Sequence, residues 1–128
     1  MEPKSLIGDG RATTLYSKHI GQQHAQDIAR LLWEMYEGTE MEFVYQPNIV
    51  CDGRETIRMK GFAYSTGKKA GLIVIHGNGG QSWGTLAHEL AHLCRKAQHC
   101  DHNWNYKEAH CKLLDDCEYF AARSTIDY

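Results

Sequence analysis

The sequence predicts an α+β fold, and three features of its apolar pattern support this prediction. Apolar residues recur at helical spacing near the start of the chain and again over its last third. Between these stretches lie short runs rich in β-branched and aromatic residues, which are typical of strands. This order predicts an N-terminal helix, a mostly antiparallel sheet of three to four strands, a second helix and a C-terminal helix. With 128 residues and no internal repeat, the chain has the length of one domain.

The first predicted helix covers residues 17–37. Its apolar positions are Ile20, Ile28, Leu31, Leu32, Met35 and Tyr36. These positions fall on one helical face, and the following Gly38 is a typical helix stop. The face bears no chemical signal, so we expect this helix to serve packing.

Four short segments then have the pattern of strands. They are residues 42–45, 49–51, 58–65 and 71–75. Pro47 separates the first two segments, and turns at Gly53 and Gly67 separate the others. The run from Leu72 to Ile75 is the most apolar and β-branched of the chain, so it should form a well-buried strand.

Two helices are predicted after these strands. Ser82 is a good N-cap for a helix that runs to about Gln98. A polar connection follows, and the last helix is predicted over residues 104–123, with Tyr106 and Cys117 on its inner side.

Charge and hydropathy argue against several classes of protein. The formal net charge is −2, so no overall field attracts nucleic acid or an anionic membrane. No apolar run is long enough to cross a bilayer, and residues 1–10 lack the apolar core of a secretory signal. We therefore expect a cytoplasmic protein, and the sequence leaves its oligomeric state open.

The cysteines indicate a reduced protein. They are Cys51, Cys94, Cys100, Cys111 and Cys117. Their number is odd and no pair has the C-x-x-C spacing, so neither a zinc ribbon nor a complete disulfide framework is expected. We expect mostly reduced and partly buried thiols, with a disulfide among the last four left as an open alternative.

The second predicted helix contains an HExxH motif, His88-Glu89-Leu90-Ala91-His92. Histidines at positions i and i+4 lie on one helical face, so both imidazoles can reach one zinc ion. The glutamate beside the first histidine can then accept a proton from a water that the zinc activates. The motif therefore predicts a zinc ion, a nucleophilic water and a general base.

A catalytic zinc usually has three protein ligands, so a third is needed. The candidates are His99, His102, Glu108, His110 and Glu118. The metzincin pattern is excluded because Arg95 and Gln98 stand where it requires glycine and histidine, and no methionine follows Met59. Two arrangements stay open, a glutamate on the following helix as in gluzincins and the histidine that precedes that helix.

The chain resembles the SprT-like zinc metallopeptidases, which include bacterial SprT proteins and the Spartan protease domain. This family has a W-x-x-x-L-x-HExxH helix and a later histidine that opens an HGxx(F/W) helix start. Here the two parts read Trp83-Gly84-Thr85-Leu86-Ala87-His88-Glu89-Leu90-Ala91-His92 and His102-Asn103-Trp104-Asn105-Tyr106, and the resemblance covers roughly residues 60–120. It implies one zincin-like metallopeptidase domain over residues 1–128, zinc on His88, His92 and His102, and Glu89 as general base.

The expected activity is hydrolysis of a protein or peptide substrate by a zinc-activated water. Zincins hold an extended substrate beside an edge strand, for which residues 60–66 or 70–76 are the candidates here. Spartan-type members act on proteins crosslinked to DNA, but the charge of this chain does not support a nucleic-acid partner.

Two alternatives to this peptidase stay open. One is a gluzincin of the ImmA/IrrE kind, which cleaves a repressor partner and would use Glu118 as third ligand. The other is a non-catalytic zinc-stabilised binding module, in which Cys94, Cys100 or Cys111 would take the fourth zinc position.

Overall fold

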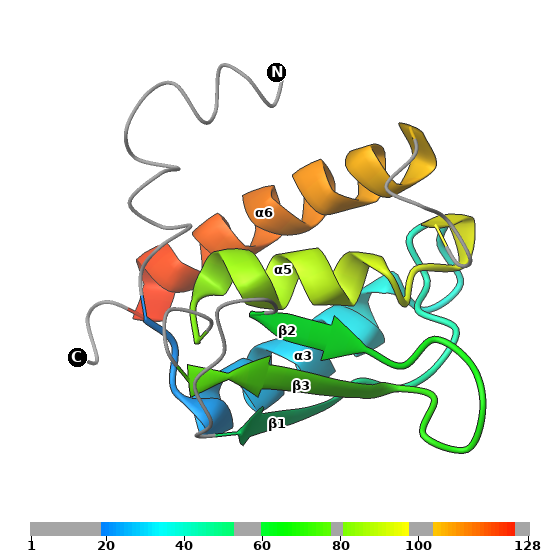
Figure 1. The fold of residues 1–128 in the computed structure, drawn as a ribbon. Helices are drawn as coiled ribbons and strands as arrows, with labels where there is room; N and C mark the ends of the chain where they lie inside the picture. Colours follow the sequence, from blue (N-terminus) through cyan, green and yellow to red (C-terminus); the bar gives the residue numbers. More distant parts are fainter. Residues whose placement is uncertain (1–18, 53–59, 78–80, 98–103, 125–128) are drawn as a thin grey trace.

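The computed structural model describes residues 19–52, 60–77, 81–97 and 104–124, the last four of them by their backbone alone (Figure 1). The elements in chain order are α3 (Gln22–Tyr36), β1 (Asn48–Asp52), β2 (Gly61–Ala63), β3 (Leu72–His76), α5 (Trp83–Ala91), the 3-10 turn η1 (Arg95–Ala97) and α6 (Trp104–Ser124). The predicted α+β class is confirmed. The N-terminal and C-terminal helices and the buried strand of residues 72–75 lie where they were predicted.

The sheet has three strands in the order β1-β3-β2, and it is mixed rather than mostly antiparallel. β1 pairs with β3 in parallel, with Asn48 opposite Leu72 and Asp52 opposite His76. β2 pairs with β3 antiparallel, with Phe62 opposite Val74. The prediction was wrong because it assumed that neighbours in sequence pair in space. The chain instead leaves β1 at one edge of the sheet and forms β2 at the other, so β3 returns between them (Figure 1).

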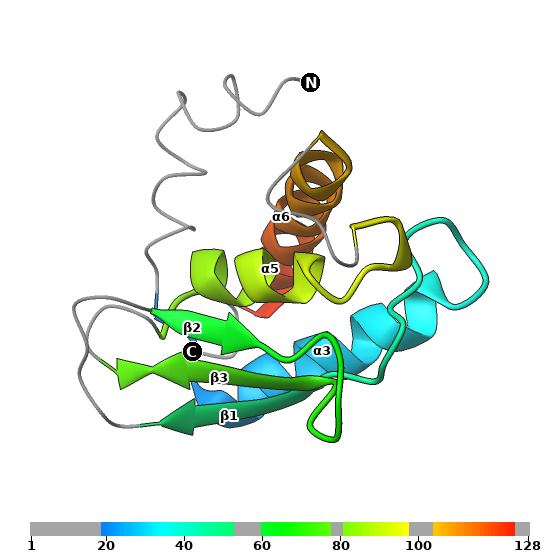
Figure 2. The same ribbon diagram turned by 45° about the vertical axis from the view of Figure 1, so that its right-hand side comes forward.

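One face of this sheet is covered by helices. Ile49, Ile73 and Ile75 are buried on that face, where α3 packs against β1 and α5 packs against β2 and β3. Val50 and Phe62 alternate with them and are exposed on the other face. α6 packs on α5 and not on the sheet, as Figure 2 shows. The HExxH helix therefore lies between the sheet and α6.

The predicted strand at residues 42–45 is wrong, and so is the predicted extension of the HExxH helix to Gln98. Residues 42–44 pair with the chain that follows α5, through a Phe43–Cys94 bridge. The Val44 amide donates to the Leu93 carbonyl at 2.8 Å, and the Arg95 amide donates to the Glu42 carbonyl at 2.8 Å. Backbone groups that would continue α5 are thus bonded to a distant segment, and the helix ends at Ala91.

The two edges of the sheet differ. The β1 edge is covered by α3, whose Gln26 and Gln22 side chains accept hydrogen bonds from the amides of Ile49 at 2.7 Å and Cys51 at 2.8 Å. The β2 edge is not covered in this way by any described residue. The hydrogen bonds of the flanking residues with β3 leave the backbone groups of Gly61 pointing away from the sheet.

α6 is the longest helix described, with 21 residues. Its buried positions include Tyr106, Ala109, Leu113 and Cys117, which matches the predicted inner side. No helix in the described ranges is both long and apolar enough to cross a membrane.

Candidate metal centre

Helix α5 places the two motif histidines on one face. Ser82 caps the helix, with its hydroxyl accepting a hydrogen bond from the Thr85 amide at 3.3 Å. Trp83 is fully buried and fixes the first turn in the core. The rings of His88 and His92 then lie with centroids 5.3 Å apart and planes at 75°. The predicted proximity of these two imidazoles is present in the structure.

Tyr106 joins this pair from α6, and its place in the site was not predicted. Its hydroxyl donates to the backbone carbonyl of His88 at 2.9 Å. Its ring lies 4.6 Å from that of His92 and 5.4 Å from that of His88, centroid to centroid. The only sequence signal for Tyr106 was an aromatic residue on the inner face of α6, and such residues more often serve core packing. Tyr106 restricts where both imidazoles can turn.

His110 lies one turn further along α6, beside His88. The two ring centroids are 5.5 Å apart with planes at 84°, and the Tyr106 ring is 5.7 Å away. Among the described residues, however, no group of three His, Cys, Asp or Glu side chains has the arrangement of a metal site. His110 therefore borders the histidine pair.

Glu89 is buried between α5 and the sheet, with 6% of its surface exposed. This burial raises its pKa from 4.5 to about 7. A carboxyl group with this pKa can both accept and release a proton near neutral pH. The glutamate thus has the property that the motif requires of a general base.

Gly61 of β2 leaves room for the side chain of Glu89 because it has no Cβ atom. A Cβ atom at this position would lie 3.2 Å from Oε2 of Glu89 and 2.9 Å from Cγ2 of Thr85. Only glycine lets β2 approach α5 this closely. A lone glycine inside a strand pattern is a known sign of such an approach, so the sequence held a signal for Gly61 that was not used.

The remaining third-ligand candidates divide into two groups. His99 and His102 lie outside the described residues, so zinc ligation by His102 stays a prediction. Glu108 is bound instead to Lys96 at 3.3 Å. Glu118 is part of α6. Within the ranges that the structure describes, it is not grouped with the two motif histidines in a way that could hold a metal ion.

The cysteines proposed for a binding module are placed differently from the histidines. Cys94 is fully buried, and burial raises its pKa to about 12. Cys111 lines a pocket on another side of α6. Both are free thiols, as are Cys51 and Cys117, while Cys100 lies outside the described residues. Cys94 and Cys117 are buried and the other two are partly buried, as expected.

The donors that the structure brings together fit zinc chemistry. Imidazole nitrogen is a common zinc ligand, with bonds of about 2.0–2.1 Å, and two rings 5.3 Å apart are close enough to share one ion. A buried carboxyl group directly follows one of the two histidines. No sulfur ligand is needed for such a site.

Comparisons with known proteins found no match to this chain. No protein-family model matches the chain, and neither a curated protein nor a solved structure is significantly similar to it. The SprT-like resemblance therefore rests on the motif residues themselves.

Proposed function

We propose that this protein is a zinc-dependent metallopeptidase of the HExxH type. The observation that supports this most is the position of Glu89, buried beside the His88–His92 pair and against the strand that forms an edge of the sheet. When bound, zinc supplies a Lewis acid that activates water and polarises a carbonyl. His88 and His92 would hold the ion, with His102 as the proposed third ligand.

Glu89 would act as the general base. Because its pKa is about 7, the carboxylate is available to take a proton from water and the acid can then deliver that proton to the leaving amine. Burial keeps the group away from bulk water. Tyr106 would position the imidazoles through its hydrogen bond to the His88 carbonyl.

An extended peptide would bind along β2. Of the two edges, that of β1 is occupied by the side chains of Gln22 and Gln26. The outward backbone groups of Gly61 lie next to Glu89, so a peptide that pairs with this edge would bring a carbonyl group close to the base. Residues 60–66, and not the central strand β3, are the substrate strand in this proposal.

The position of Glu89 also favours an enzyme over a non-catalytic zinc module. A structural zinc site needs ligands only, whereas a buried carboxyl group with a raised pKa costs stability and serves no purpose in such a module. Strained or costly groups of this kind are typical of active sites.

The first test is the substitution Glu89→Gln. We expect the variant to bind zinc with the stoichiometry of the parent and to lose cleavage of an unfolded protein such as casein by at least about 100-fold, because the general base is gone. Zinc content would be measured by atomic emission and cleavage by mass spectrometry of the products.

The control is Glu34→Gln, which removes an exposed carboxylate from α3. It should cleave at the parental rate. Equal cleavage by Glu89→Gln and the parent would contradict the proposal, and so would a parent that binds zinc but cleaves neither unfolded proteins nor peptides.

A further inference from the structure

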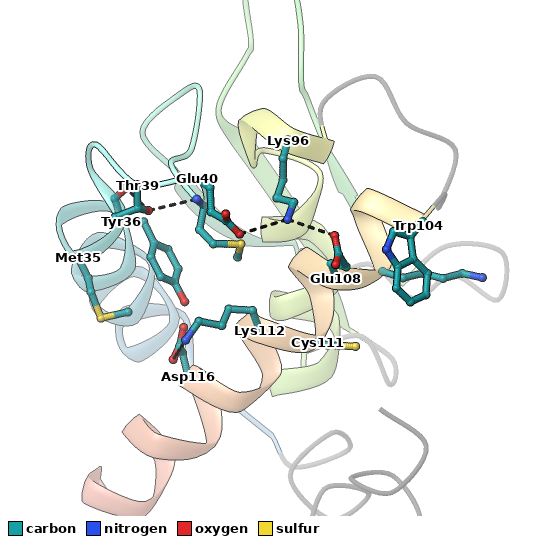
Figure 3. Close-up of a pocket in the computed structure, with 12 residues that line it drawn as sticks. Met35, Tyr36, Thr39, Glu40, Lys96, Trp104, Glu108, Cys111, Lys112 and Asp116 are labelled. Atoms are coloured by element: carbon teal, nitrogen blue, oxygen red, sulfur yellow. Dashed lines mark hydrogen bonds and ion pairs between the residues drawn. The ribbon is translucent and has the colours of Figure 1, made fainter. Parts of the chain in front are cut away.

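A pocket of about 850 Å³ lies between the C-terminal end of α3 and the first half of α6 (Figure 3). Its residues from α6, such as Trp104, Lys112 and Asp116, lie on a different side of that helix from the buried Tyr106. The volume is within the range of about 300–1,000 Å³ that is usual for small-molecule sites. This pocket is separate from the proposed zinc site.

The walls of the pocket are largely apolar. Met35, Met41 and Trp104 line it, and Met35 and Trp104 are exposed at 47% and 71%. Methionine side chains adapt to the shape of a ligand, and an exposed tryptophan offers a flat face for stacking. Such walls suit an aromatic or long aliphatic group.

At one end of the pocket a lysine lies between two carboxylates. The ammonium group of Lys96 lies 3.4 Å from a carboxylate oxygen of Glu40 and 3.3 Å from one of Glu108 (Figure 3). The Glu40 and Glu108 side chains are 80% and 45% exposed, so water screens the remaining negative charge and a ligand gains little by binding there.

The other end contains two buried polar atoms without a hydrogen-bond partner. They are the hydroxyl of Tyr36 and Oδ2 of Asp116. Tyr36 is 95% buried, with 5% of its surface exposed, and Figure 3 shows its hydroxyl pointing into the pocket toward α6. Buried polar atoms of this kind are rare in native proteins because each one costs stability.

Lys112 lies near Asp116 at this end of the pocket but forms no hydrogen bond with it. Its ammonium lies 3.6 Å from Oδ1 of Asp116, beyond hydrogen-bond distance, and its side chain is 55% exposed. The Asp116 side chain is only 17% exposed, but the pair is long and its lysine is more than half exposed, so an incoming cation can replace the lysine at low cost.

We propose that this pocket binds an amphipathic amine, with its ammonium group on Asp116 and Tyr36 and its apolar body against Met35, Met41 and Trp104. An ammonium group donates several hydrogen bonds, and both buried oxygens can accept one. A carboxylate ligand would instead meet the charge of Asp116, and a neutral alcohol would leave that charge uncompensated. The proposal is independent of the peptidase function.

The test is titration of the full chain with tryptamine, followed by calorimetry and by NMR shifts of α6. The buffer is held well above the Asp116 pKa, which burial raises to about 6. We expect saturable binding that is at least about tenfold tighter than that of tryptophol or indole-3-propionate, which have the same ring but no ammonium group.

Variants locate the site. Asp116→Asn should weaken tryptamine binding about tenfold or more, and Tyr36→Phe about threefold. Lys112→Met removes the competing cation and should strengthen binding by up to about fivefold. Asp115→Asn, on an exposed neighbour, should have no effect.

Three results would overturn the proposal. They are the absence of saturable tryptamine binding, equal binding of tryptophol, and binding to a folded Asp116→Asn variant as tight as to the parent. Melting curves of each variant show that it is folded, and because binding is read without substrate or zinc, failure here would not bear on the peptidase proposal.

Discussion

Glu89 shows how one side chain can be costly to the fold and useful to the site. The protonated carboxyl group is tolerated in its buried position, whereas the ionised form loses its hydration there. In the folded protein the pKa is about 7, whereas the ordinary pKa of a glutamate, which applies to the unfolded chain, is 4.5. The free energy of unfolding must therefore depend on pH through this residue.

The sign of this dependence follows from the two pKa values. Below pH 4.5 the group is protonated in both states and does not change the free energy of unfolding. As pH rises from 4.5 to about 7, the unfolded chain loses the proton first, so the free energy of unfolding falls. Above a pH of about 7 the group is ionised in both states, and its burial lowers the free energy of unfolding by up to about 3 kcal/mol.

Glu89→Gln should remove this pH dependence. In metal-free protein with a chelator present, the variant should be more stable than the parent at alkaline pH by up to about 3 kcal/mol, and the difference should vanish below pH 4.5. Urea denaturation across this range measures it, with Glu34→Gln as the exposed control. A stability difference that is constant with pH would show that burial does not shift the Glu89 pKa.

At the residue scale, the motif predicted which side chains carry the proposed chemistry but not which ones surround them. His88, Glu89 and His92 are neighbours in sequence, and helix geometry alone predicts their common face. Tyr106 and Gly61 reach the site from other elements, through contacts that depend on how α6 and β2 pack on α5. The contact of Tyr106 has no signature in a local pattern, and the only local sign of the other contact is a glycine inside a strand pattern.

At the scale of elements, the close approach of β2 to α5 depends on Gly61. Gly61→Ala should lower the free energy of unfolding by about 1–3 kcal/mol, because its Cβ would lie 2.9 Å from Cγ2 of Thr85. Adding Thr85→Ser removes this methyl group and keeps the hydroxyl that contacts Ser82, so it should restore part of the loss.

A double-mutant cycle of these two substitutions, followed by urea denaturation, tests the contact. Thr85→Ser alone serves as the control for any change in helix propensity. Additive effects, with no recovery in the double variant, would mean that β2 moves away freely and that the approach is not tight.

Helices were predicted better than strands because their signal is local. The periodicity of α3 and α6 is contained within each segment, and both helices lie close to their predicted ranges. The segment 42–45 has strand composition, yet its partner is the chain around Cys94 and not the sheet. Strand composition indicates an extended backbone and leaves the partner undetermined. The same limit explains why the mixed order of the sheet was missed.

At the scale of the whole molecule, the proposed zinc ion would join α5 to the chain that precedes α6. Zinc should therefore raise the melting temperature of the full chain in a concentration-dependent way, by binding the folded state. His88→Ala and His92→Ala should abolish this shift, and the exposed His19→Ala should not. Scanning calorimetry with and without a chelator measures it.

The third ligand can be identified in the same experiment. If His102 is the ligand, His102→Ala should reduce the zinc-dependent shift and Glu118→Gln should leave it intact. The reverse result would favour the gluzincin arrangement. A zinc-dependent shift that persists in His92→Ala would contradict a site on the motif.

The pairing of residues 42–44 with the chain after α5 has a consequence for how the motif can be studied. α5 has nine residues, which is too short to be a stable helix in water on its own, and His92 is its C-cap. The conformation next to His92 depends on two backbone hydrogen bonds, one donated by the Val44 amide and one accepted by the Glu42 carbonyl, far earlier in the chain. A synthetic peptide that copies the HExxH segment would therefore lack the hydrogen bonds that fix the backbone next to the second histidine. The paired histidines are a property of the assembled tertiary structure, so the motif cannot be transplanted as a linear unit.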